Sequence, residues 1–574
     1  MSFFSRLFPL AQQLSDYGRD QLRGDLSAGL TVGVMLIPQG MAYALIAGLP
    51  PIYGLYASLV PLAVYSLFGT SRQLAVGPVA MVSLLVAAAV GPLANGDPEL
   101  YIGLTLLLSL MVGVLQFGLG VARFGFLVNF LSHPVLSGFT SAAALIIGFS
   151  QLKHLLGIEL PRSNYIHEIL WAAAGRVGQI DPLTVLLGVG SILLLVGLRQ
   201  LNPSIPGALV AVMTTTGLVW AFGLDEHGVS IVGSVPGGLP APSLPPLGME
   251  NVWALTPSAL AIGLVGFMES IAVAKVYAGR HRYDIDANQE LIGLGLANIA
   301  GAFFSAYPTT GGFSRTAVND EAGARTTLAG LVAAGVIALT LLLLTPLFYY
   351  LPNAVLAAII MVAVSGLIEW KEALHLWEGD RKDLGLMALT FGATLALGIE
   401  EGILAGVIVS LIVVIYQSST PHTALMGRLP GTDTYRNLKR NPEALTQRNV
   451  VVARMDANLY FATASAFQDL VRRIDTQDPS LQAAVVDMYP VNRIDSTGVG
   501  ALKKVIETCR RHNVALYLAG VKGPVKDMLD EAGVTRMLGE DRFFFEVSGA
   551  VDAAEADVEP TDSGVERPLP DTPA

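Results

Sequence analysis

Short stretches of this sequence combine residue types that bind anions or protons, and each lies among apolar residues. TSRQLAVGPVAM at residues 70–81 is broken by Gly and Pro, and YPTTGGFSRTAVND at 307–320 by a Gly pair. Glu269 is the one carboxylate deep within the apolar run ALAIGLVGFMESIAVA. A helix that starts at a broken segment presents free backbone N–H groups and a positive dipole end, which attract anions. The chemistry indicated is therefore anion binding beside a buried acid.

Two half-helices that begin near one point would hold an anion without a fixed cation. We predict that Pro78 lies in the first turn of one half-helix and Ser314 in that of the other. Proline suits a first turn because the N–H that it lacks would be unpaired there, and the hydroxyl of Ser314 adds a donor. A glycine pair permits close backbone approach. The alternative, that both segments are merely kinks in packed helices, stays open. The predicted substrate-binding residues are Gly77, Pro78, Val79, Ala80, Gly312, Phe313, Ser314, Arg315 and, from an earlier apolar segment, Gln39.

Glu269 is predicted to couple the binding of the anion to that of a cation. A buried acid in a membrane segment is costly unless it is neutral, paired or facing a cavity, so it is a functional hypothesis by default. Proton binding or cation coordination would each fit. A structural partnership with Arg315 remains the alternative.

The elements that must position these residues are membrane helices. The chain has 574 residues, of which 52% are hydrophobic and only 14% charged, and its mean hydropathy is +0.56. Since a spanning helix needs about 20 apolar residues, we expect about fourteen segments. They are 26–46, 52–69, 76–91, 100–121, 126–156, 182–200, 204–223, 253–275, 287–304, 312–320, 326–345, 351–368, 383–399 and 402–418.

The distribution of Lys and Arg predicts the topology. If both termini are cytoplasmic, the connections rich in Lys and Arg lie on the cytoplasmic side of the membrane, as the positive-inside rule requires. Residues 28–44 also resemble residues 258–274 weakly, and a short broken segment recurs in each half. An odd number of spans per half makes the halves inverted repeats, whose broken segments mark a binding site near the midplane. Residues 1–22 are predicted to be an amphipathic segment and 23–418 the transport domain.

The character of the chain changes after the last apolar segment. Strand and helix patterns alternate, with strands expected at 449–462, 483–491 and 514–520 and helices at 466–474, 496–512 and 525–534. Such alternation predicts a small α/β domain, placed at 424–549. Residues 550–574 are rich in acids with interspersed Pro, Ser and Thr, and are predicted to be a disordered tail.

Motifs in both parts resemble one family. The stretch VVDMYPVNRIDSTGVGALKKV (485–505) resembles the signature of STAS domains, named for sulfate transporters and anti-sigma-factor antagonists. In the antagonists this loop carries a phosphorylated serine, and the matching position here is Thr497, beside Asp495 and Ser496. The alternative is that Ser496 and Thr497 only cap the helix. The segments 24–58, 69–85, 130–144 and 306–330 resemble the sulfate permease (SulP) family in order and spacing.

The resemblance implies a fold and a function. The fold is a polytopic α-helical membrane protein of about fourteen segments in two inverted repeats of about seven, with core and gate domains and a cytoplasmic STAS domain. The function is secondary active transport of a small anion across the cell (inner) membrane by alternating access, by a homodimer in the lipid bilayer. Sulfate is the first expectation, with bicarbonate or a dicarboxylate as alternatives. Coupling to a proton, as a symporter, is expected before coupling to Na⁺.

Other classes fit the sequence less well. The sequence contains no Cys/His cluster, no Gly-x-Ser-x-Gly elbow and no Gly-x-x-x-x-Gly-Lys loop, and Cys509 is its only cysteine. An enzyme, a nucleotide-driven pump, a metal site, a cofactor and a nucleic-acid partner are therefore not expected. An anion channel, an anion exchanger and a nucleobase-type carrier of the same architecture remain alternatives.

Overall fold

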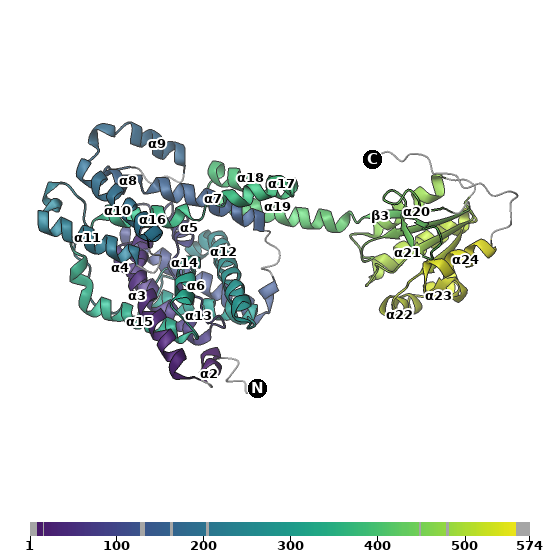
Figure 1. Ribbon diagram of the computed structural model, residues 1–574, viewed down its shortest axis with the longest axis horizontal. Helices are drawn as coiled ribbons and strands as arrows, with labels where there is room; N and C mark the ends of the chain where they lie inside the picture. The colour runs from purple at the N-terminus through teal and green to yellow at the C-terminus, as the bar shows by residue number, and fades with distance from the viewer. Residues whose placement is uncertain are drawn as a thin grey trace. The chain divides into compact units, whose positions relative to one another are not determined.

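The computed structural model describes residues 8–14, 17–126, 133–160, 165–201, 206–446, 449–477 and 481–557. The chain divides into two compact units, Met1–Leu411 and Ile412–Ala574, drawn in purple to green and in green to yellow (Figure 1). Helix α19 (Ile399–Ser419) crosses the division. Each unit is described by itself.

Unit 1 is helical, and its order of elements repeats. A long helix, a second helix, a two-residue strand, a short helix and a further helix follow one another twice. The first set is α3 (Arg19–Ile46), α4 (Pro51–Phe68), β1 (Val76–Gly77), α5 (Ala80–Val90) and α6 (Pro98–Val121). The second is α12 (Met249–His281), α13 (Ala287–Phe303), β2 (Thr310–Gly311), α14 (Phe313–Glu321) and α15 (Leu328–Leu339). This order agrees with the internal repeat predicted from sequence.

The remaining helices of unit 1 follow each set. They are α7 (His133–Ser150), α8 (Leu152–Leu156), α9 (Ile166–Ala174), α10 (Pro182–Leu201), α11 (Gly207–Phe222), α16 (Asn353–Ser365), α17 (Trp370–Glu378) and α18 (Arg381–Leu397), with short α2 (Pro9–Gln13) at the start. Every segment expected to be apolar and helical contains a helix, whereas α2, α9 and α17 were not predicted. Within the described residues, eight helices are long and apolar enough to cross a membrane. Two of the fourteen expected segments, 76–91 and 312–320, contain short helices, α5 and α14.

Glycines bring the long helices of the two sets into close contact. A Cβ atom on Gly29 of α3 would lie 2.6 Å from the carbonyl oxygen of Ala329 in α15, and one on Gly113 of α6 would lie 2.6 Å from the backbone nitrogen of Ile299 in α13. Small residues are what permit membrane helices to approach so closely. The repeats are therefore interlocked, since helices of one pack against helices of the other.

A buried carboxylate fixes the chain that leads into β1. Glu290 of α13 accepts hydrogen bonds from the Tyr65 hydroxyl (2.7 Å), the backbone nitrogens of Thr70 (2.6 Å) and Ser71 (3.0 Å), and the Thr70 hydroxyl. Asp25 of α3 acts similarly on the turn before α15, where it accepts from the nitrogen and hydroxyl of Thr326. Because each carboxylate has several donors, its burial is compensated.

Unit 2 is a six-stranded sheet in the order β4-β3-β5-β6-β7-β8. Strands β5 (Val450–Met455), β6 (Ala483–Asp487), β7 (Ala515–Ala519) and β8 (Phe543–Phe544) are parallel, and β3 (Thr423–Arg428) is antiparallel to both β4 (Tyr435–Asn437) and β5. The helices are α20 (Ala464–Gln477), α21 (Ser496–Arg511), α22 (Gly523–Glu531), α23 (Val534–Leu538) and α24 (Val547–Asp557). All six predicted strands and helices are present, although the strand predicted at 449–462 ends at Met455. The elements β3, β4, β8, α23 and α24 were missed.

Two predicted boundaries differ from the structure. The disordered tail was predicted to start at residue 550, but residues 550–557 belong to α24, which buries Ala550, Val551 and Ala554 against the sheet. This part of the prediction is wrong because the small apolar residues of α24 suffice to cover β6 and β7. Residues 558–574 lie outside the described residues. The N-terminal segment 1–22 also overlaps α3, which already begins at Arg19.

Candidate anion-binding site

The two broken segments meet in a two-stranded crossing. β1 and β2 pair antiparallel, with Val76 opposite Gly311 and Gly77 opposite Thr310. α5 follows β1 and α14 follows β2, so the two short helices leave the crossing in opposite directions and both begin beside it. Their N-cap residues, Val79 and Gly312, make no side-chain cap. The first N–H groups of each helix are thus left without an intrahelical or capping acceptor.

The first turns lie slightly later than predicted. Gly77 belongs to β1, Pro78 precedes the N-cap, and α5 begins at Ala80. The prediction that Pro78 opens the helix is wrong, because the paired strand extends the chain through Gly77. Gly312 is likewise an N-cap, and its N–H already donates to Ala75 (3.1 Å). The donors left for a ligand are those of residues 80–82 and 313–315.

Arg315 is buried at the crossing with part of its guanidinium unpaired. It is 1% exposed, and its Nη1 donates to the carbonyl oxygen of Pro78 and, at 3.5 Å, to Oε1 of Gln39. Its Nε and Nη2 have no hydrogen-bond partner within the described residues. A buried cation with unpaired donors, beside two positive helix ends, is strongly unfavourable unless an anion joins it. The geometry fits an oxyanion with several acceptor oxygens.

Gly77 and Gly312 lie against this guanidinium. A Cβ on Gly312 would stand 2.8 Å from Nη2 of Arg315, and one on Gly77 would stand 3.5 Å from the same atom. A side chain at residue 312 would therefore have to displace the guanidinium of Arg315.

Glu269 lies on α12 behind β2. One of its carboxylate oxygens, Oε2, is buried without a partner, and no ion pair joins Glu269 to Arg315 within the described residues. The next residue, Ser270, bonds to the Thr310 hydroxyl (2.6 Å) and accepts from the Gly311 nitrogen (2.8 Å). Helix α12 therefore holds β2 in place, and the acid beside Ser270 keeps one oxygen without a hydrogen-bond partner.

The predicted Gln39 joins the same group of side chains. Its Nε2 donates to the hydroxyl of Tyr43 (3.1 Å), and both residues are buried. Across the crossing, Ser83 of α5 donates to the hydroxyl of Tyr307 (3.3 Å), a contact that sequence analysis missed. The signal for Tyr307 was available, because it is the first residue of the second broken segment.

The two other predicted residues of α14 face open space. Phe313 is 57% exposed and Ser314 is exposed, although Arg315 is not. An anion at the guanidinium would therefore approach over the first turn of α14.

In unit 2, the Asp-Ser-Thr-Gly loop caps α21 through the aspartate. Asp495 accepts hydrogen bonds from the nitrogens of Gly498 (2.7 Å) and Phe461 (3.0 Å). The alternative that Ser496 and Thr497 cap the helix is wrong, because they are its first residues, and both are exposed. Burial raises the pKa of Asp487, which ends β6 before this loop.

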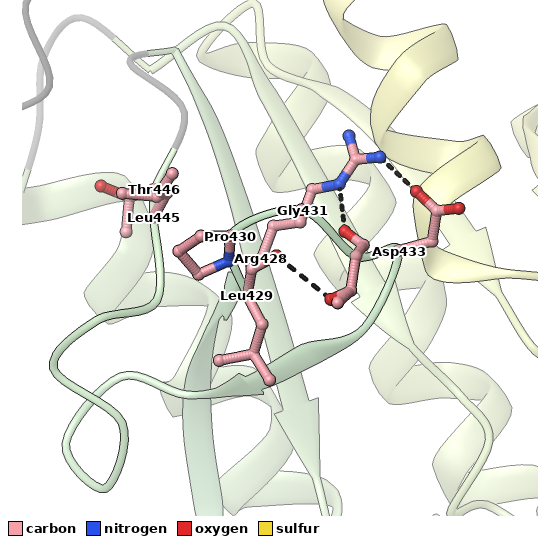
Figure 2. Close-up of a pocket in the computed structure, with 8 residues that line it drawn as sticks. Arg428, Leu429, Pro430, Gly431, Asp433, Leu445 and Thr446 are labelled. Atoms are coloured by element: carbon pink, nitrogen blue, oxygen red, sulfur yellow. Dashed lines mark hydrogen bonds and ion pairs between the residues drawn. The ribbon is translucent and has the colours of Figure 1, made fainter.

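A hollow of about 290 Å³ in unit 2 contains an arginine that is paired differently from Arg315 (Figure 2). Its arginine, Arg428, donates to the Thr432 carbonyl (2.8 Å) and to Asp433, and lies 3.9 Å from Asp552. Because its charge is already paired with acids, this hollow offers no comparable place for an anion.

Comparison with known proteins gives a consistent class. The sulfate permease family matches residues 22–390, and the STAS domain matches residues 441–553. The chain is 40% identical over 568 residues to "Sulfate transporter 4.1, chloroplastic" of Arabidopsis thaliana, covering 96% of this chain and 83% of that protein. It is 36% identical over 546 residues to "Probable sulfate transporter MT1781" of Mycobacterium tuberculosis (strain CDC 1551 / Oshkosh), covering 95% and 97%.

Solved structures agree. The murine Solute Carrier 26 family member A9 anion transporter in the inward-facing state matches with a TM-score of 0.90 at 27% identity, covering 96% of this chain and 95% of that chain. The transmembrane domain of a cyanobacterial bicarbonate transporter, BicA, matches with a TM-score of 0.60 at 25% identity, covering 69% and 98%. The fold and the crossing thus define a multi-pass membrane transporter, not an enzyme. The chain belongs to the sulfate permease family and ends in a STAS domain.

Proposed function

We propose that this protein transports sulfate across the membrane by secondary active transport, and that the anion binds at the crossing of β1 and β2. The observation that carries the proposal is the buried guanidinium of Arg315, whose Nε and Nη2 lack partners beside two uncapped helix N-termini. The relatives named as sulfate transporters favour sulfate, and the likeness to BicA makes bicarbonate the second candidate.

The anion is held chiefly by backbone N–H groups. Those of residues 80–82 and 313–315 supply donors from both repeats, Arg315 adds charge, and Ser314 adds a hydroxyl. Free N–H groups are tolerated at membrane depth only where they line a cavity or meet a ligand. In alternating access, the crossing opens to one side of the membrane at a time while the repeats stay interlocked.

Glu269 couples the movement of the anion to a proton. Its unpartnered oxygen lies on the helix that holds β2, so protonation at Glu269 acts on the element that precedes α14. A proton on Glu269 lowers the net negative charge that moves across the membrane with the anion.

The remaining assignments complete the proposal. The protein works as a homodimer in the inner membrane with both termini cytoplasmic. The STAS domain is regulatory or structural, since it has its own apolar core. Truncation after Tyr416 is expected to impair folding, dimer contacts or turnover but to keep anion binding. Complete loss of binding by a well-folded truncated protein would refute this role.

The deciding experiment is uptake into proteoliposomes. Radiolabelled sulfate, bicarbonate, chloride, oxalate and a dicarboxylate are offered with and without proton or sodium gradients. We expect saturable sulfate uptake, counter-transport, and stimulation by an inward proton gradient. Uptake that neither saturates nor shows counter-transport would identify a channel instead.

A further inference from the structure

Helix α17 connects two apolar helices of unit 1 and is too short to span a membrane. It has nine residues and is therefore about 14 Å long, whereas the apolar core of a bilayer is about 30 Å thick. The preceding helix, α16, ends at Ser365, and a turn at Gly366 separates it from α17. The following helix, α18, begins at Arg381. α17 thus lies where α16 ends and α18 starts.

The inner side of α17 is fastened to α7 (Figure 1). The carboxylate of Glu369, the N-cap residue, accepts a hydrogen bond from the Ser137 hydroxyl, and its backbone nitrogen donates to the Ser141 hydroxyl (3.1 Å). Glu372 lies 3.6 Å from Nδ1 of His133. These contacts determine which residues of α17 point away from the protein.

The outward surface of α17 is divided into two stripes, each of which follows the helix at positions i, i+4 and i+7. The apolar stripe consists of Trp370 (60% exposed), Leu374 (55%) and Trp377 (65%). The polar stripe consists of Lys371, His375 and Glu378, all exposed. Leu376 is buried on the remaining side. A helix with protein, apolar and polar sides has the pattern of one that lies in the interface between membrane and water.

The residue types of the apolar stripe also fit a membrane interface, where tryptophan is enriched. The Nζ atom of Lys371 lies 5.8 Å from the centre of the Trp370 ring, and Cζ of Arg381 lies 6.0 Å from that of Trp377. Each ring therefore has a cation beside it that can extend to a lipid phosphate while the ring stays in the apolar layer. Contact of the whole stripe with water would be unfavourable.

The other half of unit 1 has a helix in the equivalent place. α9 also has nine residues and lies between α8 and α10, as α17 lies between α16 and α18. It buries Ile169 and exposes Leu170 (44%) and Trp171 (84%). The next helix in each half starts after an aspartate, Asp181 or Asp380, which accepts hydrogen bonds from its first turn. Exposed tryptophan at both places indicates that the two helices share an environment.

We infer that α17 binds the surface of a phospholipid bilayer, with its apolar stripe among the glycerol groups and upper acyl carbons. Lys371 and Arg381 lie toward the phosphates. The exposed acids Glu378 and Asp380 balance these two cations, so zwitterionic and anionic lipids fit equally well. The bound helix holds the adjoining ends of α16 and α18 at one depth in the membrane, whichever anion the protein carries.

The test uses tryptophan fluorescence of the full-length protein in nanodiscs. The sequence contains five tryptophans, and replacing the others by Phe leaves Trp370 as the sole reporter. The nanodiscs contain phosphatidylcholine brominated either at acyl carbons 6 and 7 or at carbons 11 and 12. We expect strong quenching by the shallow bromines and weaker quenching by the deep ones, because the ring lies near the headgroups. Brominated phosphatidylglycerol should quench to the same extent.

A matched pair of substitutions tests which side of α17 meets the lipid. Leu374→Glu places a charge in the apolar stripe and should lower the shallow quenching of Trp370 by about twofold or more, since a charge is unfavourable in hydrocarbon. His375→Glu places the same charge in the polar stripe, one residue away, and should leave the quenching unchanged.

The other outcomes would overturn the inference. Quenching of Trp370 by aqueous iodide and not by bromine would show that α17 faces water. Protection from both quenchers would show that another protein surface, such as a second copy of the chain, covers the helix. Deep quenching that exceeds shallow quenching, or an equal loss in Leu374→Glu and His375→Glu, would contradict an interfacial position as well.

Discussion

Helices α5 and α14 occupy equivalent places in the two repeats but differ in their side chains. Both follow a two-residue strand and lack a side-chain cap. The first turn of α5 consists of Ala80, Met81 and Val82, all buried and apolar. The first turn of α14 has exposed Phe313 and Ser314 and the buried Arg315. Each repeat therefore provides a helix N-terminus without a side-chain cap, whereas only the second repeat adds a charged side chain there, Arg315.

The two helices are also held differently. Thr316 of α14 accepts from the nitrogen of Ala75 (3.1 Å), and Asn319 donates to the carbonyl oxygen of Gln73 (2.8 Å). α5 has its Ser83–Tyr307 contact and otherwise packs through apolar residues. Hydrogen bonds restrict the orientation of a helix more narrowly than apolar packing does. In the proposed site we therefore expect α14 to position the ligand and α5 to supply a second set of backbone donors.

The largest effect is expected at Gly312, the N-cap of α14, which lies against the guanidinium of Arg315. Gly312→Val places a branched side chain where even a Cβ would lie 2.8 Å from Nη2 of Arg315. Overpacking of about 1–3 kcal/mol should lower the rate of sulfate uptake by about tenfold to a hundredfold. Gly118→Val on α6, where a Cβ meets nothing within 4 Å, is the matched control. Normal uptake by Gly312→Val would show that the crossing does not carry the anion.

Removal of the charge is the next largest change. Arg315→Gln should weaken sulfate binding by about tenfold to a hundredfold, because a charge-assisted hydrogen bond contributes about 1.5–3 kcal/mol. Anion selectivity should shift as well, since the divalent anion loses more than a monovalent one. Equilibrium binding of radiolabelled sulfate measures both. Arg428→Gln, in the paired arginine of unit 2, should bind normally; equal binding by Arg315→Gln would place the anion elsewhere.

The backbone elements of this site could be predicted from the sequence, whereas several of its side-chain contacts could not. The broken segments were predicted because Gly and Pro interrupt apolar runs, and they contain β1 with α5 and β2 with α14. The start of α5 was misplaced, because the strand pair joins Val76 to Gly311 and Gly77 to Thr310, residues far apart in the sequence that local patterns do not connect. Glu290 and Asp25 were missed for the same reason, since their donors come from distant turns.

Glu269→Gln tests the buried acid of α12, the helix that holds β2 ahead of α14. The variant should keep sulfate exchange within about threefold of wild type, since the amide preserves the shape of the side chain. It should lose stimulation by a proton gradient, because the amide cannot be protonated near neutral pH. Uptake at several imposed gradients measures this. Glu250→Gln, at the exposed start of α12, is the control. A variant that still follows the gradient would place coupling elsewhere.

Ser314→Ala should give the smallest effect and defines how much of the site is backbone. The hydroxyl is exposed on the first turn of α14, next to the donors of Arg315, and it contributes about one hydrogen bond. Loss of about 0.5–1.5 kcal/mol should raise the sulfate Kd by about two- to tenfold without a change in stability. Ser191→Ala in α10, whose hydroxyl donates to Leu187 of its own helix (2.6 Å), should leave the Kd unchanged. If Ser314→Ala instead matched Arg315→Gln in effect, the side chains and not the backbone N–H groups would hold the anion, and α5 would lose its proposed role.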